Sequence, residues 1–261
     1  MRTGYSFCQS KYASVEGRDE YLPSTRRVTI LPTISVDEHT KVEWEEKLTR
    51  YFSDDDARTG IHVSDLTLCL RQTILTRLYT PSIPAMGALR FLFGRAFEKL
   101  VFSIMLPEAT QELEVSEGGI EGHIDFGSEP YDFECKFSWK YVKDDPSDLF
   151  EENFWWLDQA GQYAVMRRRT ACKFAVIHVQ PIPTLMIYHV EWTTRELSDI
   201  WERATRGRDY IIGIQEKLKV DPDDMSVLTM RLPSPLSGKM CKGCGVYDIC
   251  MSLPPKKRRK E

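Results

Sequence analysis

Stretches with helical apolar spacing alternate along the chain with short runs rich in β-branched and aromatic residues. Apolar positions three or four apart predict five helices, at residues 42–52, 64–78, 85–105, 151–168 and 194–218. The short runs predict five strands, at residues 112–116, 120–126, 131–137, 173–179 and 185–191. Glycines and prolines between these runs, such as Gly118-Gly119, supply the turns.

After the helix at 42–52, the order of these elements is helix, helix, three strands, helix, two strands, helix. This order favours an α/β fold with a mixed central sheet flanked by helices, and the closely spaced strands argue against a doubly wound parallel sheet. We divide the chain into four parts. They are an N-terminal extension of unknown role (1–57), a core (58–218), a C-terminal cysteine segment (219–252) and a basic tail (253–261).

The composition is that of an ordinary globular protein. The 261 residues are 42% hydrophobic and 28% charged, which excludes disorder along the whole chain. No apolar run reaches the roughly 18 residues of a membrane helix, and no secretory leader is recognisable. We therefore expect a cytoplasmic protein, or a nuclear one if the source is eukaryotic and the tail is a localisation signal. The net charge of -4 gives no hint of a nucleic-acid partner.

The most informative stretch carries two carboxylates and a lysine. Asp125 and Glu134 are nine residues apart, which suits two neighbouring strands joined by a tight turn. Alternation along a strand puts Glu134 and Lys136 on one face beside Asp125, with Cys135 on the other face. Paired carboxylates attract a hard cation such as Mg²⁺, and a lysine beside it can orient a water, as metal-assisted phosphodiester hydrolysis requires. The alternative is a solvated strand face in which Lys136 is only a cross-strand partner.

Further groups for this site come from the helices and from the same strand. Gln159 and Tyr163 are four residues apart and share a helix face that could touch DNA or the lysine; alternatively Tyr163 is half-buried on an ordinary helix surface. Glu98, which follows Gly94, could supply another carboxylate or could simply pair with a neighbouring arginine or lysine. His123 lies two residues before Asp125, on the same strand face, and is expected to make local hydrogen bonds or to touch the substrate.

Three cysteines lie within ten residues near the C-terminus: Cys241, Cys244 and Cys250. Thiolates at this spacing converge on a soft centre, either Zn²⁺ or an iron–sulfur cluster. Cys69 is the natural fourth ligand, 172 residues before Cys241, and would clamp the start of the core to its end; alternatively it is a small buried helix residue. The remaining cysteines are predicted to be free thiols: Cys8, Cys135 and Cys172.

Basic and aromatic residues near these sites are candidates for contacts with a nucleic acid. A positive groove is predicted from Arg71, Arg77, Lys136, Lys140 and the run 167–169, including Arg167. Stacking on unpaired bases is predicted for Trp139, Trp155, Trp156 and Tyr163. We expect one of Trp155 and Trp156 to be buried and the other partly exposed, since neighbouring helix positions diverge by about 100°. The run 256–260 adds five basic residues, for DNA affinity, nuclear localisation or solubility.

Taken in order, these motifs resemble a known family. Six motifs occur in the following order within residues 60–252: Ser64…Cys69-Leu70-Arg71, Gly94-x3-Glu98, Gly122-x2-Asp125, Glu134-x-Lys136, Gln159-x3-Tyr163 and the C-terminal cysteine trio. The set resembles the RecB-like branch of the PD-(D/E)XK nuclease superfamily. It is most similar to the iron–sulfur members typified by the CRISPR-associated RecB-like exonuclease family of spacer acquisition.

The resemblance implies a restriction-endonuclease-like fold that cuts DNA, mostly single-stranded and from an end. It implies a [4Fe–4S] cluster on Cys69 and the C-terminal trio, and Mg²⁺ or Mn²⁺ on Asp125 and Glu134 with the Cys135 carbonyl as a further ligand. Lys136 would be the catalytic lysine, and Gln159 and Tyr163 would match the family's Gln-x3-Tyr motif. The implied partners are DNA and either a CRISPR integrase complex or other recombination proteins.

The chain departs from this family at one position. Many members carry a histidine just before the glutamate of the Gly94 motif, where this chain has Phe97, which cannot bind a metal. Glu98 would replace it as a ligand, as in other branches of the superfamily. The alternative to an active nuclease is a module that keeps the fold, has lost most or all of its activity, and binds DNA or a partner protein.

Overall fold

The structure is a computed structural model that describes residues 37–53, 60–67, 69–79, 85–220, 241 and 244–252. The chain divides into two units, and the fold below is that of the unit His39–Glu261. Most of the N-terminal extension, Cys8 and the basic tail lie outside the described residues. Predictions for these parts therefore stay predictions.

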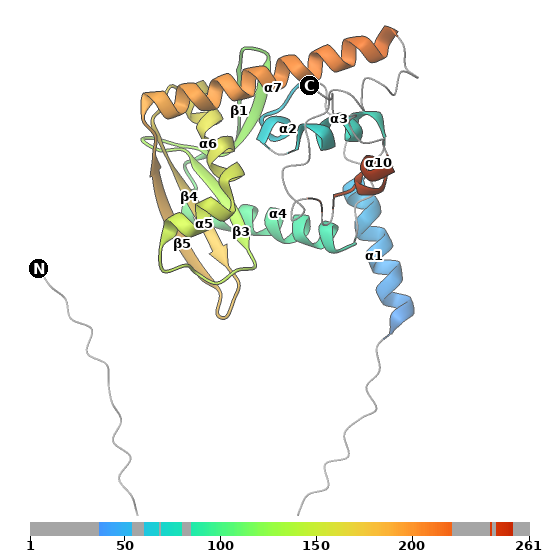
Figure 1. The fold of residues 1–261 in the computed structure, drawn as a ribbon. Helices are drawn as coiled ribbons and strands as arrows, with labels where there is room; N and C mark the ends of the chain where they lie inside the picture. Colours follow the sequence, from blue (N-terminus) through green and yellow to red (C-terminus); the bar gives the residue numbers. More distant parts are fainter. Residues whose placement is uncertain are drawn as a thin grey trace, which may run out of the picture. The chain divides into compact units, whose positions relative to one another are not determined.

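The described residues form helices and strands in the predicted order (Figure 1). The helices are α1 (Glu38–Ser53), α2 (Val63–Thr67), α3 (Leu70–Leu78), α4 (Ala85–Met105), α5 (Pro146–Glu152), α6 (Phe154–Met166), α7 (Thr194–Val220) and α10 (Tyr247–Ser252). The strands are β1 (Thr110–Glu117), β2 (Ile120–Gly127), β3 (Phe133–Ser138), β4 (Ala171–His178) and β5 (Thr184–Glu191). None of the helices in these ranges is long and apolar enough to cross a membrane.

The five strands form one mixed sheet in the order β1-β2-β3-β4-β5. Neighbouring strands pair antiparallel except β3 and β4, which are parallel and are joined by the crossover through α5 and α6. The prediction of a mixed central sheet flanked by helices is confirmed. A parallel pair needs such a crossover because its strands run in the same direction, so this connection also brings the Gln159–Tyr163 face of α6 to the sheet.

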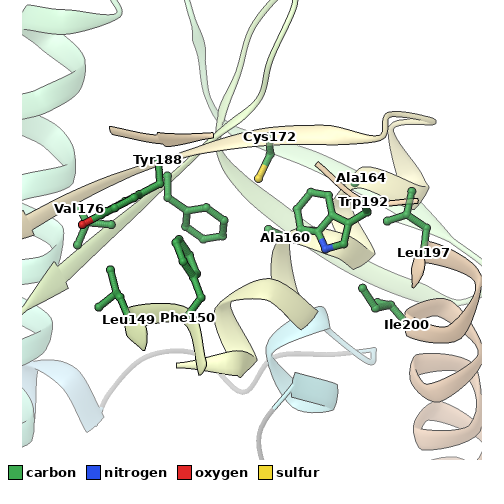
Figure 2. Close-up of a cluster of buried hydrophobic side chains, with 11 residues drawn as sticks. Leu149, Phe150, Ala160, Ala164, Cys172, Val176, Tyr188, Trp192, Leu197 and Ile200 are labelled. Carbon is green, nitrogen blue, oxygen red and sulfur yellow. The ribbon is translucent and has the colours of Figure 1, made fainter. Parts of the chain in front are cut away.

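One hydrophobic core lies between the sheet and the crossover helices (Figure 2). Phe150 from α5 packs edge-on against Phe174 of β4 and Tyr188 of β5, with ring centroids 5.2 and 5.5 Å apart. Ile200 of α7 joins the same core and covers α6 at Gly161, where an added Cβ would lie 2.6 Å from the isoleucine. This close approach holds α6 between the sheet and α7.

Two of the predicted helices are interrupted. The stretch 64–78 is two helices, because Cys69 is extended (φ -85°, ψ 109°) and serves as the N-cap of α3. The stretch 151–168 is also divided, because Asn153 leaves the helical region (φ -130°, ψ 42°) and its side-chain amide donates to the Leu149 carbonyl. Both predictions of a single continuous helix were therefore wrong. The first of the two helices, α5, begins earlier than the predicted helix, at Pro146.

Candidate functional site

The carboxylate–lysine cluster lies where strands β2 and β3 separate. Phe126 and Phe133 are the only described pair between these strands. Beyond them the backbone ladder is replaced by a side chain, since the Cys135 N–H donates to the Asp125 carboxylate at 2.7 Å. The hairpin predicted from the nine-residue spacing therefore forms, and where its ladder opens the Asp125 carboxylate lies against the β3 backbone.

Lys136 joins the two carboxylates. Its Nζ donates to Glu134 Oε2 at 2.8 Å and lies 4.0 Å from Asp125 Oδ2. Glu134 is only 2% exposed, and its second oxygen, Oε1, is buried without a hydrogen-bond partner among the described residues. Leaving a carboxylate oxygen dry and unpaired costs on the order of 1–3 kcal/mol or more, so this atom marks where a further positive or hydrogen-bonding group fits.

Glu98 of α4 approaches the same cluster. Burial raises the pKa of Glu98 to about 7, with Asp125 adding to the increase and Lys136 opposing it. Phe97, at the position where the resembled family carries histidine, is buried at 8% exposed. The helix therefore turns its aromatic neighbour into the protein and presents the carboxylate to Asp125.

The carboxylates hold protons more tightly than free ones. Burial raises the pKa of Glu134 to about 8, and the neighbouring Asp125 raises it further while Lys136 opposes the shift. Burial also raises the pKa of Asp125, against Lys136. For Lys136 burial alone would lower the pKa, but the two carboxylates outweigh burial and the pKa is raised. The lysine stays charged while the carboxylates resist carrying full negative charge together.

Glu112 of β1 is a further acidic residue that the sequence did not single out. The pairs Gln111–Phe126 and Leu113–Ile124 bracket it, so it lies opposite Asp125 across the β1–β2 ladder. Its φ is +48°, a left-handed conformation that only a few per cent of residues other than glycine adopt. Its charge raises the pKa of both Glu98 and Asp125. A single glutamate in a polar strand gives no sequence signal for such a placement.

Gln159 and Tyr163 contact each other as their spacing predicted. The Gln159 side-chain amide donates to the Tyr163 hydroxyl at 3.3 Å. Tyr163 is buried, and burial together with the charge of Glu134 raises the pKa of its hydroxyl. Its ring lies over Gly122 of β2, where an added Cβ would stand 2.5 Å from the ring. The tyrosine therefore seals one side of the cluster.

His123 does not join the carboxylates. Its ring stacks on His62 with centroids 6.0 Å apart, and its Nε2 lies 3.8 Å from Glu114. It is half-exposed, so its surroundings favour the local role over a substrate contact.

The four cysteines of the predicted cluster gather in one neighbourhood, where α10 lies beside α3 (Figure 1). Burial raises the pKa of the Cys250 thiol, and Cys69, Cys244 and Cys241 raise it as well, whereas Arg71 lowers it. Arg71 also donates to the Cys250 carbonyl at 3.0 Å, and its buried Nε has no partner. Within the described residues, however, no three histidine, cysteine, aspartate or glutamate side chains converge closely enough to hold a metal ion.

Residues predicted to form a positive groove make local contacts in the described part of the chain, and the groove itself stays a prediction. Arg71 faces the cysteine segment, and Arg77 donates to Asp65 at 2.6 Å. Lys140 pairs with Glu152 at 2.6 Å. Arg167 and Arg169, which follow α6, form ion pairs with the buried Asp132. These basic residues satisfy local carboxylates and carbonyls, which their sequence positions did not indicate.

The tryptophans divide into two environments. Trp156 packs against the core and contacts Phe150 edge-on, with centroids 6.4 Å apart, so it is held inside. Trp155 and Trp156 are both half-buried, so the prediction of one buried and one partly exposed tryptophan was wrong. Trp139, just after β3, is 43% exposed and contacts Phe137. Among these tryptophans, Trp139 is thus the most open to a ligand.

No protein-family model and no curated protein matches the sequence. Solved structures resemble the fold, among them SSO0001, with a TM-score of 0.52 and 18% identity over 82% of this chain and 96% of that one. The alkaline exonuclease LHK-Exo from Laribacter hongkongensis aligns with a TM-score of 0.42 and 11% identity over 69% and 99% of the two chains. Its complex with dAMP aligns with a TM-score of 0.40 and 12% identity over 70% and 99%.

The overlap with LHK-Exo is too loose to establish a common fold. The likeness to SSO0001 shows a shared fold and says nothing of activity. The described part of the chain is therefore a mixed α/β domain of the SSO0001 fold, in which a buried carboxylate–lysine cluster lies between β2 and β3.

Proposed function

We propose that this protein is a metal-dependent DNA nuclease of the PD-(D/E)XK type. The observation that carries the proposal is the buried Glu134 Oε1, which accepts no hydrogen bond within the described part of the chain although Asp125 and Lys136 lie nearby. A dry, unpaired carboxylate oxygen next to a second carboxylate fits a hard divalent cation better than it fits a structural ion pair, whose oxygens would all be satisfied.

The residues have separate tasks in this proposal. Asp125 and Glu134 would hold Mg²⁺ or Mn²⁺, with Glu98 and the Cys135 carbonyl as further oxygen ligands. Such an ion, when bound, polarises the phosphate and lowers the pKa of a water. Lys136 orients Glu134 through its 2.8 Å hydrogen bond and keeps a positive charge next to the phosphate.

Gln159 and Tyr163 would keep the cluster ordered. Their hydrogen bond and the packing of the tyrosine ring on Gly122 fix the tyrosine against β2. The ring also excludes water from the buried side of Glu134, which strengthens every charge interaction there. A polar residue at position 163 would wet this side and weaken the site.

The substrate and pathway in the proposal rest on the family resemblance. Its RecB-like members imply a single-strand exonuclease, acting in CRISPR spacer acquisition with an integrase complex or in repair and recombination. Residues 58–218 would be the nuclease core, and 219–252 the cysteine segment.

The proposal also includes a [4Fe–4S] cluster on Cys69, Cys241, Cys244 and Cys250. Their donor chemistry suits it, and Cys69, Cys241 and Cys244 lie near enough to raise the pKa of the Cys250 thiol, although the described thiols do not converge closely enough to hold a metal ion. Anaerobically purified protein should contain iron and sulfide and absorb near 400 nm, and Cys250→Ala should lose both with a lower melting temperature. Zinc in place of iron, or an unchanged iron content in the variant, would reject the cluster.

Cleavage of single strands labelled at the 5′ or 3′ end, in Mn²⁺, tests the nuclease itself. Wild type should shorten the strands, and Asp125→Asn and Lys136→Ala should each lose at least about 100-fold in rate. Asp199→Asn, an exposed carboxylate of α7, is the matched control and should cleave normally. No cleavage by wild type, or normal cleavage by both site variants, would contradict the proposal.

A second candidate function is a nuclease-fold module that binds DNA or a partner protein with little or no turnover. The buried Phe97 favours it, because this position offers no metal ligand. DNA binding that persists in chelator without any Mn²⁺-dependent cleavage would support this candidate over the first.

A further inference from the structure

We propose that Phe93, Phe137 and Trp139 form an aromatic platform on which an unpaired nucleobase of a single-stranded substrate stacks. The platform deepens the proposed nuclease function and rests on it, because it lies beside the carboxylate–lysine cluster. It explains how a protein with a net charge of -4 would grip a single strand.

The three rings come from two elements and meet at the surface. Phe93 of α4 stacks on Phe137 of β3, with centroids 5.9 Å apart and planes 12° apart. Trp139 meets both rings edge-on, at 6.0 Å from Phe93 and 5.1 Å from Phe137. Each ring thus fixes the others, and a base can stack on them without any of them having to be ordered first.

Two of the rings remain open. Phe93 is 45% exposed and Trp139 is 43% exposed, although both already contact other aromatic side chains. A ring held rigidly at the surface loses little entropy when a base covers it, and every base has a face that can stack. The platform therefore suits recognition that tolerates any base sequence.

The position of the platform fits a substrate in the catalytic cluster. Phe137 directly follows Lys136 on β3, so by strand alternation its ring lies on the opposite face from the lysine, the face on which Phe93 of α4 packs. Phe93 lies five residues before Glu98 on α4, a rise of about 7.5 Å along the helix. A nucleotide next to a phosphate held at the cluster would place its base on these rings, so the platform selects strands whose bases are unpaired.

The charge around the platform is also suitable. Arg90 lies three residues before Phe93 on α4 and so shares its side of the helix. It is exposed, and it has no ion-pair partner among the described residues. Proteins that bind single-stranded nucleic acids combine a cation with an open aromatic ring, so that the phosphate lies on the cation and the base stacks on the ring. A purely apolar protein partner would leave this arginine unsatisfied.

The test measures binding without turnover, in chelator, with full-length protein. The probe is a fluorescein-labelled oligothymidylate of about 12 nucleotides, a length within the usual site sizes, and its affinity is read by anisotropy. Trp139→Leu should weaken binding by about 5- to 150-fold, and Phe93→Leu should weaken it as well. Phe154→Leu removes a ring of equal exposure (42%) at the start of α6 and should stay within about twofold of wild type.

A strand of the same length without bases separates stacking from phosphate binding. It should bind wild type and Trp139→Leu equally weakly, and melting temperatures show that each variant is folded. The platform is rejected if Trp139→Leu binds the oligothymidylate as tightly as wild type does. It is rejected as well if wild type binds the strand without bases as tightly as it binds the oligothymidylate. It is also rejected if wild type forms a dimer that Trp139→Leu dissolves, since the rings would then cover a second copy.

These outcomes are independent of catalysis. A protein that cleaves in Mn²⁺ but binds the oligonucleotide equally well with and without Trp139 loses only the platform. A protein whose binding depends on Trp139 but which never cleaves loses only the nuclease proposal.

Discussion

Substituting Gly122 by alanine should disturb the site through packing alone. The added Cβ would stand 2.5 Å from the Tyr163 ring and 3.1 Å from Val63, whereas ordinary contacts begin at 3.4 Å. The ring must therefore retreat by about 0.9 Å within a buried cluster that also contains Ile124. Overpacking of this kind costs about 1–3 kcal/mol. It should also loosen the hydrogen bond from Gln159 to the tyrosine.

Urea unfolding followed by fluorescence measures the effect, and the midpoint of Gly122→Ala should fall by roughly 0.4–1.2 M. Gly213→Ala is the matched control in the interior of α7, where an added Cβ meets nothing within 4 Å, and it should stabilise the protein by about 0.5–1 kcal/mol. Tyr163→Leu should partly rescue Gly122→Ala, giving a double variant less destabilised than the two single effects together. A midpoint for Gly122→Ala at or above wild type would refute the packing argument.

The raised pKa values of Glu98 (about 7) and Glu134 (about 8), against an ordinary 4.5, mean that the folded state holds their protons more tightly than the unfolded state. In chelator, their contribution to stability should therefore be complete below about pH 4.5 and be lost as the pH rises to about 8. The melting temperature should decline over this range. Mn²⁺ should reduce the decline, and Glu134→Gln should flatten it. Melting temperatures that rise steadily between pH 5 and 8 in chelator would be inconsistent with this assignment. Arg169→Ala removes a 3.2 Å ion pair to the buried Asp132, and the free energy of unfolding measured in urea should fall by on the order of 3 kcal/mol. Arg206→Ala removes an exposed ion pair and is the control, whose stability should change by less than about 0.5 kcal/mol. Equal effects of the two arginine variants would show that the Asp132 pair is not structural.

The sequence was sufficient where the determining interactions are local. The helix 85–105 has the predicted bounds because its apolar spacing is strong and prolines flank it. The spacing of Asp125, Glu134 and Lys136 predicted their meeting because a hairpin fixes which residues lie opposite one another. At Asn153 a local signal existed, since asparagine favours turns, but the long apolar pattern masked it.

The sequence was insufficient where distant elements determine a residue's role. Nothing near Glu112 in the chain indicates that its backbone is left-handed or that it lies opposite Asp125, because both follow from the pairing with β2. Phe93 and Trp139 meet only because α4 docks on β3. The contacts of the arginines after α6 could not be predicted because their partner, Asp132, is 35 residues before Arg167.

The hydrogen bond from Arg71 to Cys250 joins residues 179 positions apart. Ile74 and Leu75 of α3 and Ile211 of α7 share one core with Val246, which lies just before α10. During synthesis this core cannot close until residue 250 has left the ribosome, although its other half was made near the start. Contacts so distant in sequence slow folding. A nascent chain therefore displays this apolar surface while all the residues between α3 and Val246 are made, and it should depend on chaperones during that interval.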